Sequence, residues 1–285
     1  MPASIARRGF LVAPLLALPA FANDATAPLA ELERRNGGRL GVAALDTASG
    51  RRVGYRADEL FPLCSTFKFL AAAFVLARVD RGEEKFDRRV VFSEKDLVTY
   101  SPVTKEHVAP GSMSMAEICD AAVTLSDNTA GNLMFASFGG PAALTAYARS
   151  LGDRATRLDR IETELNEATP GDPRDTTTPV AMLGTMQRLL IEDALSVSSR
   201  DRLIGWLLAS KTGARRLRAG LPADWRVGDK TGSGNNGTAN DVAIALPPGR
   251  SPILITAYYT ESTIPDDARN TVIAEAGRLA IAGLG

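Results

Sequence analysis

The sequence predicts an α+β protein in which one antiparallel sheet is built from both chain ends and flanked by helices, with an all-helical lobe inserted between them. Stretches typical of strands occur near both ends of the chain, whereas the part from residue 65 to about residue 209 is mostly helical in pattern. We find no internal repeat or low-complexity linker between these parts. With 285 residues and 45% apolar content, the chain can bury a sizeable core.

Apolar runs between turn residues mark the strands. The first two runs surround a turn at residues 48–50, and the later ones follow Gly213. Among the later runs, residues 232–237 are glycine-rich and predict a turn, while Pro247, Pro248 and Gly249 interrupt the pattern. Strands are therefore expected at residues 40–46, 52–56, 225–230, 241–246 and 253–259.

Apolar periodicity and terminal signals mark the helices. Residues 69–77 are apolar on nearly every face, which indicates a buried helix. Ser114-Met-Ala-Glu117 is a capping box, and Gly139-Gly-Pro141 ends a later helix. Helices are expected at residues 28–35, from 65 onward, from 114 to 125, and at 128–138, 142–151, 179–192, about 198–209 and 266–282.

The first 22 residues resemble an export signal. Arg7-Arg8 begins a twin-arginine pattern, about eleven apolar residues follow, and Ala20-Phe21-Ala22 supplies a small-x-small cleavage site. An apolar run this short, with Pro14 and Pro19 inside it, cannot span a bilayer. We therefore expect a periplasmic protein, exported by the twin-arginine route, with no membrane attachment after signal removal.

Charge and metal-type residues exclude several other functions. Lysine plus arginine equals aspartate plus glutamate at 33 each, so no basic surplus indicates nucleic acid as a partner. His107 is the single histidine and has no second metal-type ligand nearby, which argues against a zinc site. We interpret it as a hydrogen-bonding residue at a loop or helix end. No metal and no cofactor is expected.

Ser65 and Lys68 form the one Ser-x-x-Lys of the chain, at the start of the buried helix. A hydroxyl and an amine one turn apart on one helix face can exchange a proton. Such a pair suits a serine nucleophile that has no histidine partner. The pattern is also common at ordinary helix starts, so this pair alone does not define a site.

Three further patterns carry hydroxyl, amine, amide or carboxyl groups that could act together with Ser65 and Lys68. Ser126-Asp127-Asn128 lies between two expected helices and could simply be an N-cap. Lys230-Thr231-Gly232-Ser233 ends an expected strand, where a polar hairpin end is the simpler interpretation. Lys-Thr-Gly also occurs at residues 211–213, but there Gly213 is expected to cap a helix.

Glu162 and Asn166 lie in the charged, irregular segment at residues 154–178. Long irregular segments inside compact domains are usually functional or disordered. Arg160 and Asp175 carry opposite charges near its two ends, so we expect them to close it as an Ω-type loop.

In order and context, these patterns resemble those of the class A β-lactamases, known by Ser-x-x-Lys, Ser-Asp-Asn and Lys-Thr-Gly boxes. The resemblance runs from about residue 27 to the C-terminus. Outside the boxes it includes Tyr100-Ser-Pro-Val-Thr104, Gly139-Gly-Pro141, Arg174-Asp-Thr-Thr-Thr-Pro179 and Trp225. It implies the β-lactamase/transpeptidase-like fold and a small-molecule β-lactam substrate.

The resemblance also implies a role for each residue. Ser65 is the nucleophile, and its proton goes either to Lys68 in its neutral form or to Glu162 through a water, which the sequence leaves open. Ser126, with Lys230 nearby, passes a proton to the ring nitrogen, and Glu162 with Asn166 activates the deacylating water. The oxyanion hole and substrate contacts are assigned to the backbone N–H groups of Ser65 and Ser233, to Asn128, Thr231, Gly232 and Ser233, and to Tyr100 at the entrance.

Departures from the family pattern define further expectations. The family has a cis peptide after this glutamate, usually before proline, but here Thr163 follows. The usual arginine on the strand after the lysine box is missing, so Arg216, preferred over Arg269, is expected to anchor the substrate carboxylate.

The two cysteines also differ from those of some family members. Cys64 resembles the cysteine that carbapenem-hydrolysing members bridge to the hairpin, where this chain has Gly234. Cys119 resembles half of another family disulfide, whose partner position is Ala72. We therefore predict two free thiols.

We expect residues 1–22 to be the signal and residues 23–285 a single catalytic domain, with a sheet lobe at about 27–60 and 214–285 and a helical lobe at about 61–213. The expected protein is a monomeric serine β-lactamase that confers resistance. The alternatives are a penicillin-binding DD-peptidase-like acyltransferase and a non-catalytic β-lactam sensor. Glu162 with Asn166, and the lack of a membrane anchor, favour the hydrolase.

Overall fold

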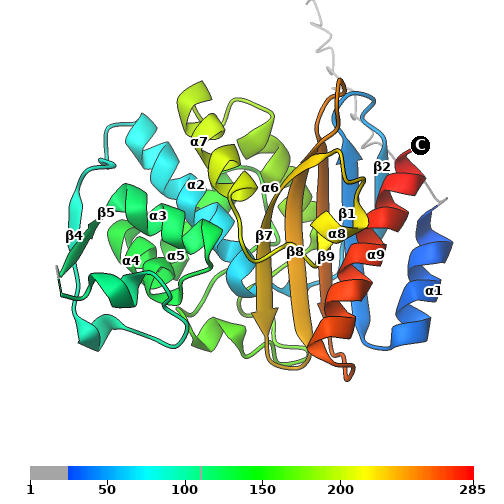
Figure 1. The fold of residues 1–285 in the computed structure, drawn as a ribbon, viewed down its shortest axis with the longest axis horizontal. Helices are drawn as coiled ribbons and strands as arrows, with labels where there is room; N and C mark the ends of the chain where they lie inside the picture. Colours follow the sequence, from blue (N-terminus) through cyan, green and yellow to red (C-terminus); the bar gives the residue numbers. More distant parts are fainter. Residues whose placement is uncertain (1–24, 110) are drawn as a thin grey trace, which may run out of the picture.

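A five-stranded antiparallel sheet forms the centre of the computed structural model, which describes residues 25–109 and 111–285 (Figure 1). The strand order is β2-β1-β9-β8-β7. The predicted signal lies outside the described residues. Strands β1 and β9 are neighbours, with Leu45 opposite Leu254, so the two chain ends share one sheet as predicted. The strands are β1 (Arg39–Asp46), β2 (Arg52–Tyr55), β7 (Arg226–Gly234), β8 (Thr238–Leu246) and β9 (Ile253–Thr260).

Alternate residues of the strands face two separate hydrophobic clusters. In β1, Val42 and Ala44 belong to one cluster, whereas Ala43 and Leu45 belong to the other. This is the period of two that a sheet covered on both faces requires. The first cluster lies under α1 (Thr26–Asn36), α8 (Leu217–Gly220) and α9 (Asp266–Leu284), which cover the face of the sheet toward the viewer in Figure 1.

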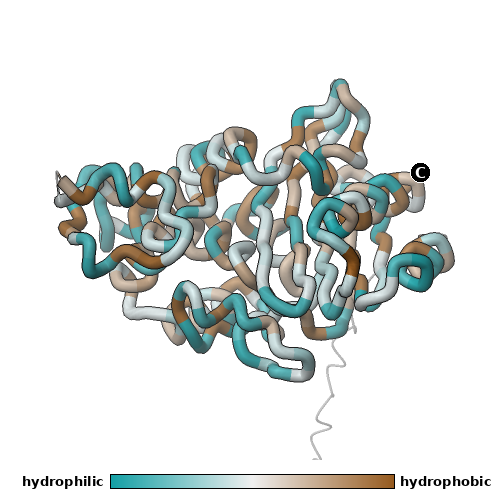
Figure 2. Tube along the Cα trace, turned by 60° about the horizontal axis from the view of Figure 1, so that its bottom comes forward, coloured by the Kyte–Doolittle hydropathy of each residue, from teal (hydrophilic) through white to brown (hydrophobic). Residues whose placement is uncertain are grey.

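The second cluster extends from the other face of the sheet into the helices between the two strand groups. Helices α2 to α5 lie beyond the β7 edge of the sheet (Figure 1). Hydrophobic and hydrophilic residues are mixed along much of the chain (Figure 2), whereas the central strands β8 and β9 are buried almost throughout. The helices are α2 (Phe67–Asp80), α3 (Met115–Thr124), α4 (Asn128–Phe138), α5 (Pro141–Ser150), α6 (Pro179–Leu190) and α7 (Val197–Leu208).

Short elements complete the fold. Two small antiparallel pairs had not been predicted, because two or three residues carry no readable period. No helix in the described part of the chain is long and apolar enough to cross a membrane. The short elements are β3 (Phe61–Pro62) with β6 (Thr176–Thr177), β4 (Arg89–Val91) with β5 (Ser112–Ser114), η2 (Cys64–Thr66), η3 (Glu94–Asp96), η4 (Thr104–His107) and η5 (Glu164–Asn166).

The local signals were mostly confirmed. Ser114 caps α3 with the predicted capping box, and Gly139 ends α4 in the left-handed conformation at φ 95°. His107 lies at the end of η4, where its Nδ1 is 3.0 Å from the Val103 carbonyl oxygen. The irregular segment at 154–178 contains only η5 and β6.

Two local predictions were wrong. The turn predicted at 232–237 is confined to residues 235–237, because β7 continues through Gly234. Gly213 is not a helix cap: α7 ends at Leu208, and Gly213 packs so tightly on Asp229 that a Cβ would lie 1.3 Å from its Oδ2. In both places the glycine serves a close tertiary approach.

Candidate active site

Ser65 and Lys68 lie where η2 leads into α2, with their side chains directed into the interior. Lys68 is fully buried, and its Nζ donates a 2.7 Å hydrogen bond to Ser65 Oγ. The close packing around Lys68 depends on Gly131 of α4, where a Cβ would lie 2.9 Å from Lys68 Cε. The predicted hydroxyl–amine pair is therefore present, and a glycine that the sequence analysis missed makes room for it.

The ammonium of Lys68 also contacts the Ser-Asp-Asn box and Glu162. Its Nζ lies 2.7 Å from Glu162 Oε1, 2.6 Å from Asn128 Oδ1 and 3.1 Å from the Ser126 carbonyl oxygen. Burial lowers the pKa of Lys68, and the negative charge of Glu162 opposes that shift. An amine with a lowered pKa is closer to the neutral form that can accept a proton from Ser65.

Glu162 is fixed at both of its carboxylate oxygens. Oε2 accepts a hydrogen bond from Asn166 Nδ2 at 2.5 Å, and Oε1 lies 3.3 Å from Ser65 Oγ, which donates to it. Asn132 of α4 holds the backbone of Glu162 through its N–H and its carbonyl oxygen, each at 2.9 Å. The Glu162–Thr163 peptide is cis, as the family pattern implied. Asn132 was missed by the sequence analysis.

Ser126 and Lys230 form a second hydroxyl–amine pair across the pocket. Lys230 Nζ donates to Ser126 Oγ at 2.9 Å and to the Thr231 carbonyl oxygen at 2.8 Å. Burial and the positive charge of Lys68 hold the pKa of Lys230 well below its usual value. The N-cap interpretation of this box is also correct, because Asp127 caps α4 by accepting from Ala130 N at 2.8 Å.

The lysine box runs along the edge strand β7 beside η2. Gly232 permits this approach, since a Cβ there would lie 2.9 Å from the Leu63 carbonyl oxygen. The close contact places Thr231, Gly232 and Ser233 along the same pocket as Ser65. Of the two Lys-Thr-Gly sequences, the one at Lys230 is therefore the strand-edge box.

Arg216 binds strand β7 at Gly232 and Ser233 of the lysine box. Its Nη1 donates to the carbonyl oxygens of Gly232 at 2.6 Å and Asn240 at 2.7 Å, and its Nη2 donates to Ser233 Oγ at 2.7 Å. Arg269 instead donates to the Ile264 carbonyl oxygen and does not line the pocket. The structure thus places Arg216 and not Arg269 in the site.

The pocket has a volume of about 500 Å³. Tyr100 stands at its rim with 56% of its surface exposed, and its carbonyl oxygen accepts from Asn128 N at 3.0 Å. Thr212 Oγ1 lies 2.6 Å from Thr231 Oγ1. Lys211 and Thr212 were missed, because their Lys-Thr-Gly had been interpreted as a helix end. The lining residues are Ser65, Tyr100, Ser126, Asn128, Asn166, Lys211, Thr212, Arg216, Thr231, Gly232 and Ser233.

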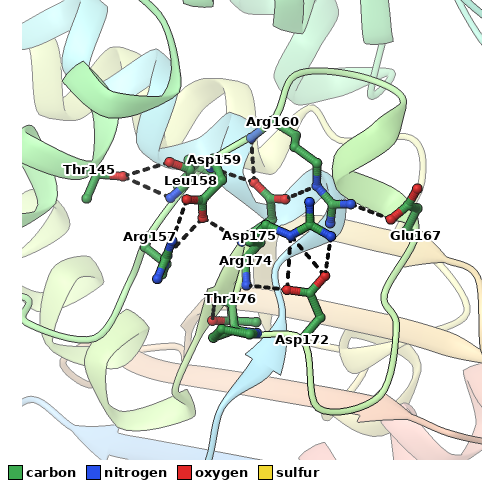
Figure 3. A network of polar contacts seen from close by, with 11 residues as sticks. Thr145, Arg157, Leu158, Asp159, Arg160, Glu167, Asp172, Arg174, Asp175 and Thr176 are labelled. Atoms are coloured by element: carbon green, nitrogen blue, oxygen red, sulfur yellow. Dashed lines mark hydrogen bonds and ion pairs between the residues drawn. The ribbon is translucent and has the colours of Figure 1, made fainter.

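The loop that carries Glu162 is closed by the predicted ion pair (Figure 3). Arg160 Nε lies 2.6 Å from Asp175 Oδ2, and Asp175 Oδ1 accepts from the backbone N–H groups of Asp159 at 2.7 Å and Arg160 at 3.0 Å. Arg160 also pairs with Glu167. One buried carboxylate thus joins the two ends of the loop.

Both cysteines are free and buried, as predicted. Burial, with a smaller contribution from Glu162, raises the pKa of the Cys64 thiol to about 12. A Cβ at Gly234 would lie 2.6 Å from Cys64 Sγ, so the position is adjacent but carries no thiol.

Comparison with known proteins decides the family. The model of the Beta-lactamase enzyme family matches residues 24–284. An ancestral class A β-lactamase (GNCA) of known structure is 64% identical, covers 90% of this chain and 99% of its own, and superimposes with a TM-score of 0.89. The chain belongs to the class A β-lactamase family. It is a serine β-lactamase, with β-lactam hydrolysis and the resistance this confers as its function.

Other relatives agree with this assignment. The chain is 52% identical to β-lactamase AST-1 of Nocardia asteroides, over 90% of this chain and 82% of the relative. It is 47% identical to β-lactamase CTX-M-8 of Citrobacter amalonaticus, over 93% and 91%. The putative class A β-lactamase PenP of Rhodopseudomonas palustris, 59% identical over 90% of this chain and 98% of its own, has a TM-score of 0.89. Neither the peptidase nor the sensor alternative finds support among them.

Proposed function

We propose that the β-lactamase opens the β-lactam amide through an acyl-enzyme on Ser65 and releases the product with a water activated by Glu162. The observation that carries this proposal is the position of the Glu162 carboxylate. One oxygen is held by Asn166, and the other lies 3.3 Å from the Ser65 hydroxyl. A carboxylate so placed can accept a proton from a water that attacks the acyl group on Ser65.

Acylation requires that Ser65 lose its proton as it attacks the carbonyl carbon. Lys68 contacts the hydroxyl directly at 2.7 Å, and Glu162 is near enough to act through a water. Both bases therefore remain part of the proposal. Negative charge develops on the carbonyl oxygen in this step. Its stabilisation is assigned to the backbone N–H groups of Ser65 and Ser233, and each donor contributes roughly 10²–10³ in rate.

Departure of the ring nitrogen requires a proton donor. Ser126 is assigned this step, because its hydroxyl accepts from Lys230 and can pass its own proton onward. Asn128 uses one amide N–H for the Thr99 carbonyl oxygen at 2.8 Å, and the second is assigned to the side-chain carbonyl of the substrate. Tyr100 forms the wall of the entrance.

The ring carboxylate of the substrate is assigned to the hydroxyls of Thr231 and Ser233, beside Gly232. Arg216 donates to the Ser233 hydroxyl oxygen, which leaves the Ser233 proton available for the carboxylate. Arg216 thus supports the anchor through Ser233 and adds a positive charge behind it.

We also propose that the mature enzyme is a monomeric periplasmic protein, exported by the twin-arginine route, with residues 23–285 forming a single catalytic domain. Arg7 and Arg8 with the cleavage site after Ala22 support the export route. The sheet lobe at about 27–60 and 214–285 and the helical lobe at about 61–213 both contribute residues to the pocket. A site formed by both lobes supports one domain.

The decisive experiment compares the wild type with Glu162→Ala on a chromogenic cephalosporin. We expect many turnovers from the wild type and a stalled acyl-enzyme, visible by intact mass, from the variant, with deacylation about 10²–10⁴-fold slower. Glu164→Ala is the matched control, because Glu164 is an exposed acid on the same loop. A single stoichiometric burst from the wild type would instead support a peptidase-like acyltransferase.

A further inference from the structure

The lining of the pocket is positively charged. Among its residues Lys211 and Arg216 are cationic, and none is an acid. Arg216 has little capacity left for a ligand, because Nη1 donates to two carbonyl oxygens, Nε to Asn270 Oδ1 at 2.8 Å and Nη2 to Ser233 Oγ. A guanidinium has five N–H donors, so one remains.

Lys211 differs from Arg216 in being exposed. Within residues 25–109 and 111–285, no carboxylate or carbonyl oxygen accepts a hydrogen bond from its ammonium or pairs with it. Its backbone is nevertheless fixed: Lys211 N donates to the Thr124 carbonyl oxygen at 2.9 Å, and the next residue, Thr212, lies 2.6 Å from the Thr231 hydroxyl. The free cation therefore stands on an anchored segment at the lysine-box end of the pocket.

Substrate chemistry defines what would lie beside this cation. In a cephalosporin, the carbon that bears the ring carboxylate, C4, is bonded directly to C3. A substituent on C3 must therefore lie next to the group held by Thr231 and Ser233. Lys211 lines the same pocket as Thr231 and Ser233, and its ammonium on a four-carbon chain is mobile and acts as a point charge.

We propose that Lys211 is a specificity-determining residue that provides a second anion subsite, favouring cephalosporins with an anionic substituent at C3. The inference rests on the proposed function, because it requires the ring carboxylate to lie against Thr231 and Ser233. The first anion, the ring carboxylate, is common to all these substrates. The second anion is what Lys211 discriminates.

The test uses two cephalosporins that differ by a single sulfonate group, and hence by one negative charge. Both carry a 7-mandelamido group and a tetrazolylthiomethyl group at C3, and the tetrazole bears an N-methyl group in one and an N-sulfomethyl group in the other. We expect the ratio of their kcat/KM values, anionic over neutral, to fall about threefold in Lys211→Ala and about tenfold in Lys211→Glu at low salt. The effect should shrink in about 0.5 M salt, which screens exposed charges.

Lys105→Ala is the matched control, since it removes an exposed lysine that does not line the pocket and should leave the ratio unchanged. Each kcat/KM is measured by competition against the chromogenic cephalosporin, so that the value can also be determined for a substrate that is hydrolysed slowly. If the ratio of the two kcat/KM values is the same in the wild type and in the Lys211 variants, the anion subsite is wrong while the proposed function stands. If wild type forms no acyl-enzyme with either compound or the chromogenic reporter, the proposed function itself fails.

Discussion

At the scale of single residues, two carboxyl groups lie fully buried on neighbouring strands next to the site. Asp229 of β7 accepts from Arg218 Nη2 at 2.8 Å, and Asp241 of β8 accepts from Leu217 N at 3.0 Å. In the described part of the chain, the other oxygen of each, Oδ2 of Asp229 and Oδ1 of Asp241, has no hydrogen-bond partner. Both acids contact the residues that follow Arg216, Asp241 through the backbone N–H of Leu217 and Asp229 through the side chain of Arg218.

These two acids predict a pH dependence of stability. Burial raises the pKa of both, for Asp241 with the charge of Asp229 as a second cause, while Arg216, Arg218 and Lys230 oppose the shifts. The folded protein therefore keeps a proton that the unfolded chain releases near the ordinary value of 3.8. The stability linked to this proton is complete below that pH and is lost as pH rises through the folded-state pKa.

Asp241→Asn resembles the protonated acid at every pH. We expect the variant to match the wild type near pH 4 and to be more stable by about 1–3 kcal/mol at pH 8, because unfolding of the variant releases no proton from this position. Thermal unfolding across that pH range measures the difference. A wild type that is more stable than Asp241→Asn at pH 8 would show that Asp241 is ionised and well paired.

The residues of the site divide into those readable in the sequence and those that only the fold reveals. Ser65 with Lys68, and Ser126 with Asn128, could be predicted because one short local pattern contains both members of each pair. Asn132 gave no such signal, because it contacts Glu162 thirty residues away. Gly131 and Thr212 likewise have roles that depend on partners from distant elements.

At the scale of elements, the loop from Arg160 to Asp175 positions Glu162, with the three-residue η5 as its one regular element. Asp175 is 1% exposed in its side chain and Arg160 is 15% exposed, so their ion pair is largely removed from solvent. Removing one partner of a buried pair leaves an uncompensated charge. The loop should therefore depend on this pair more than on its exposed ion pairs.

Asp175→Asn should destabilise the loop, at a cost on the order of 3 kcal/mol. Because Glu162 lies on this loop and Ser65 does not, we expect deacylation to slow more than acylation. Stopped-flow kinetics with intact-mass detection of the acyl-enzyme separates the two steps. Deacylation as fast as in the wild type would mean that the ion pair does not act through Glu162, and equal slowing of both steps would mean that Glu162 also assists acylation.

Arg174→Ala provides the control for the loop. Arg174 pairs with Asp172 at 2.7 Å on the same loop, but its side chain is 48% exposed. Exposed pairs contribute about 0–1 kcal/mol, so this variant should keep near-normal deacylation.

The bounds of a helix or strand were predicted correctly where its local sequence signals agree with the way it packs. The bounds of α4 were predicted correctly, since Asp127 caps its start and Gly139 ends it. The end of β7 was not, because Gly232 and Gly234 suggest a turn but are present for space: a Cβ at Gly234 would lie 2.8 Å from the Asn166 carbonyl oxygen. A sequence does not distinguish a glycine that turns the chain from one that admits a neighbour.

At the scale of the whole molecule, the sheet joins both chain ends while the active site takes residues from both lobes. Cys64 lies beside the nucleophile and Cys119 on α3, and both belong to the same hydrophobic cluster. Both are 0% exposed, and burial raises the pKa of both thiols. Neither thiol should react with a thiol reagent while the protein is folded.

Both thiols lie in the helical lobe, so they test whether this lobe opens as one unit together with the rest of residues 23–285. Cys64→Ala and Cys119→Ala each leave a single thiol, so each variant reports the opening of one region. In a cooperative single domain, both thiols should become reactive at the same denaturant concentration and together with the change in tryptophan fluorescence. If Cys119 reacted at a lower concentration than Cys64, part of the helical lobe would open by itself. The active site, which needs Ser126 and Asn128 from that lobe, would then be lost before Cys64 is exposed.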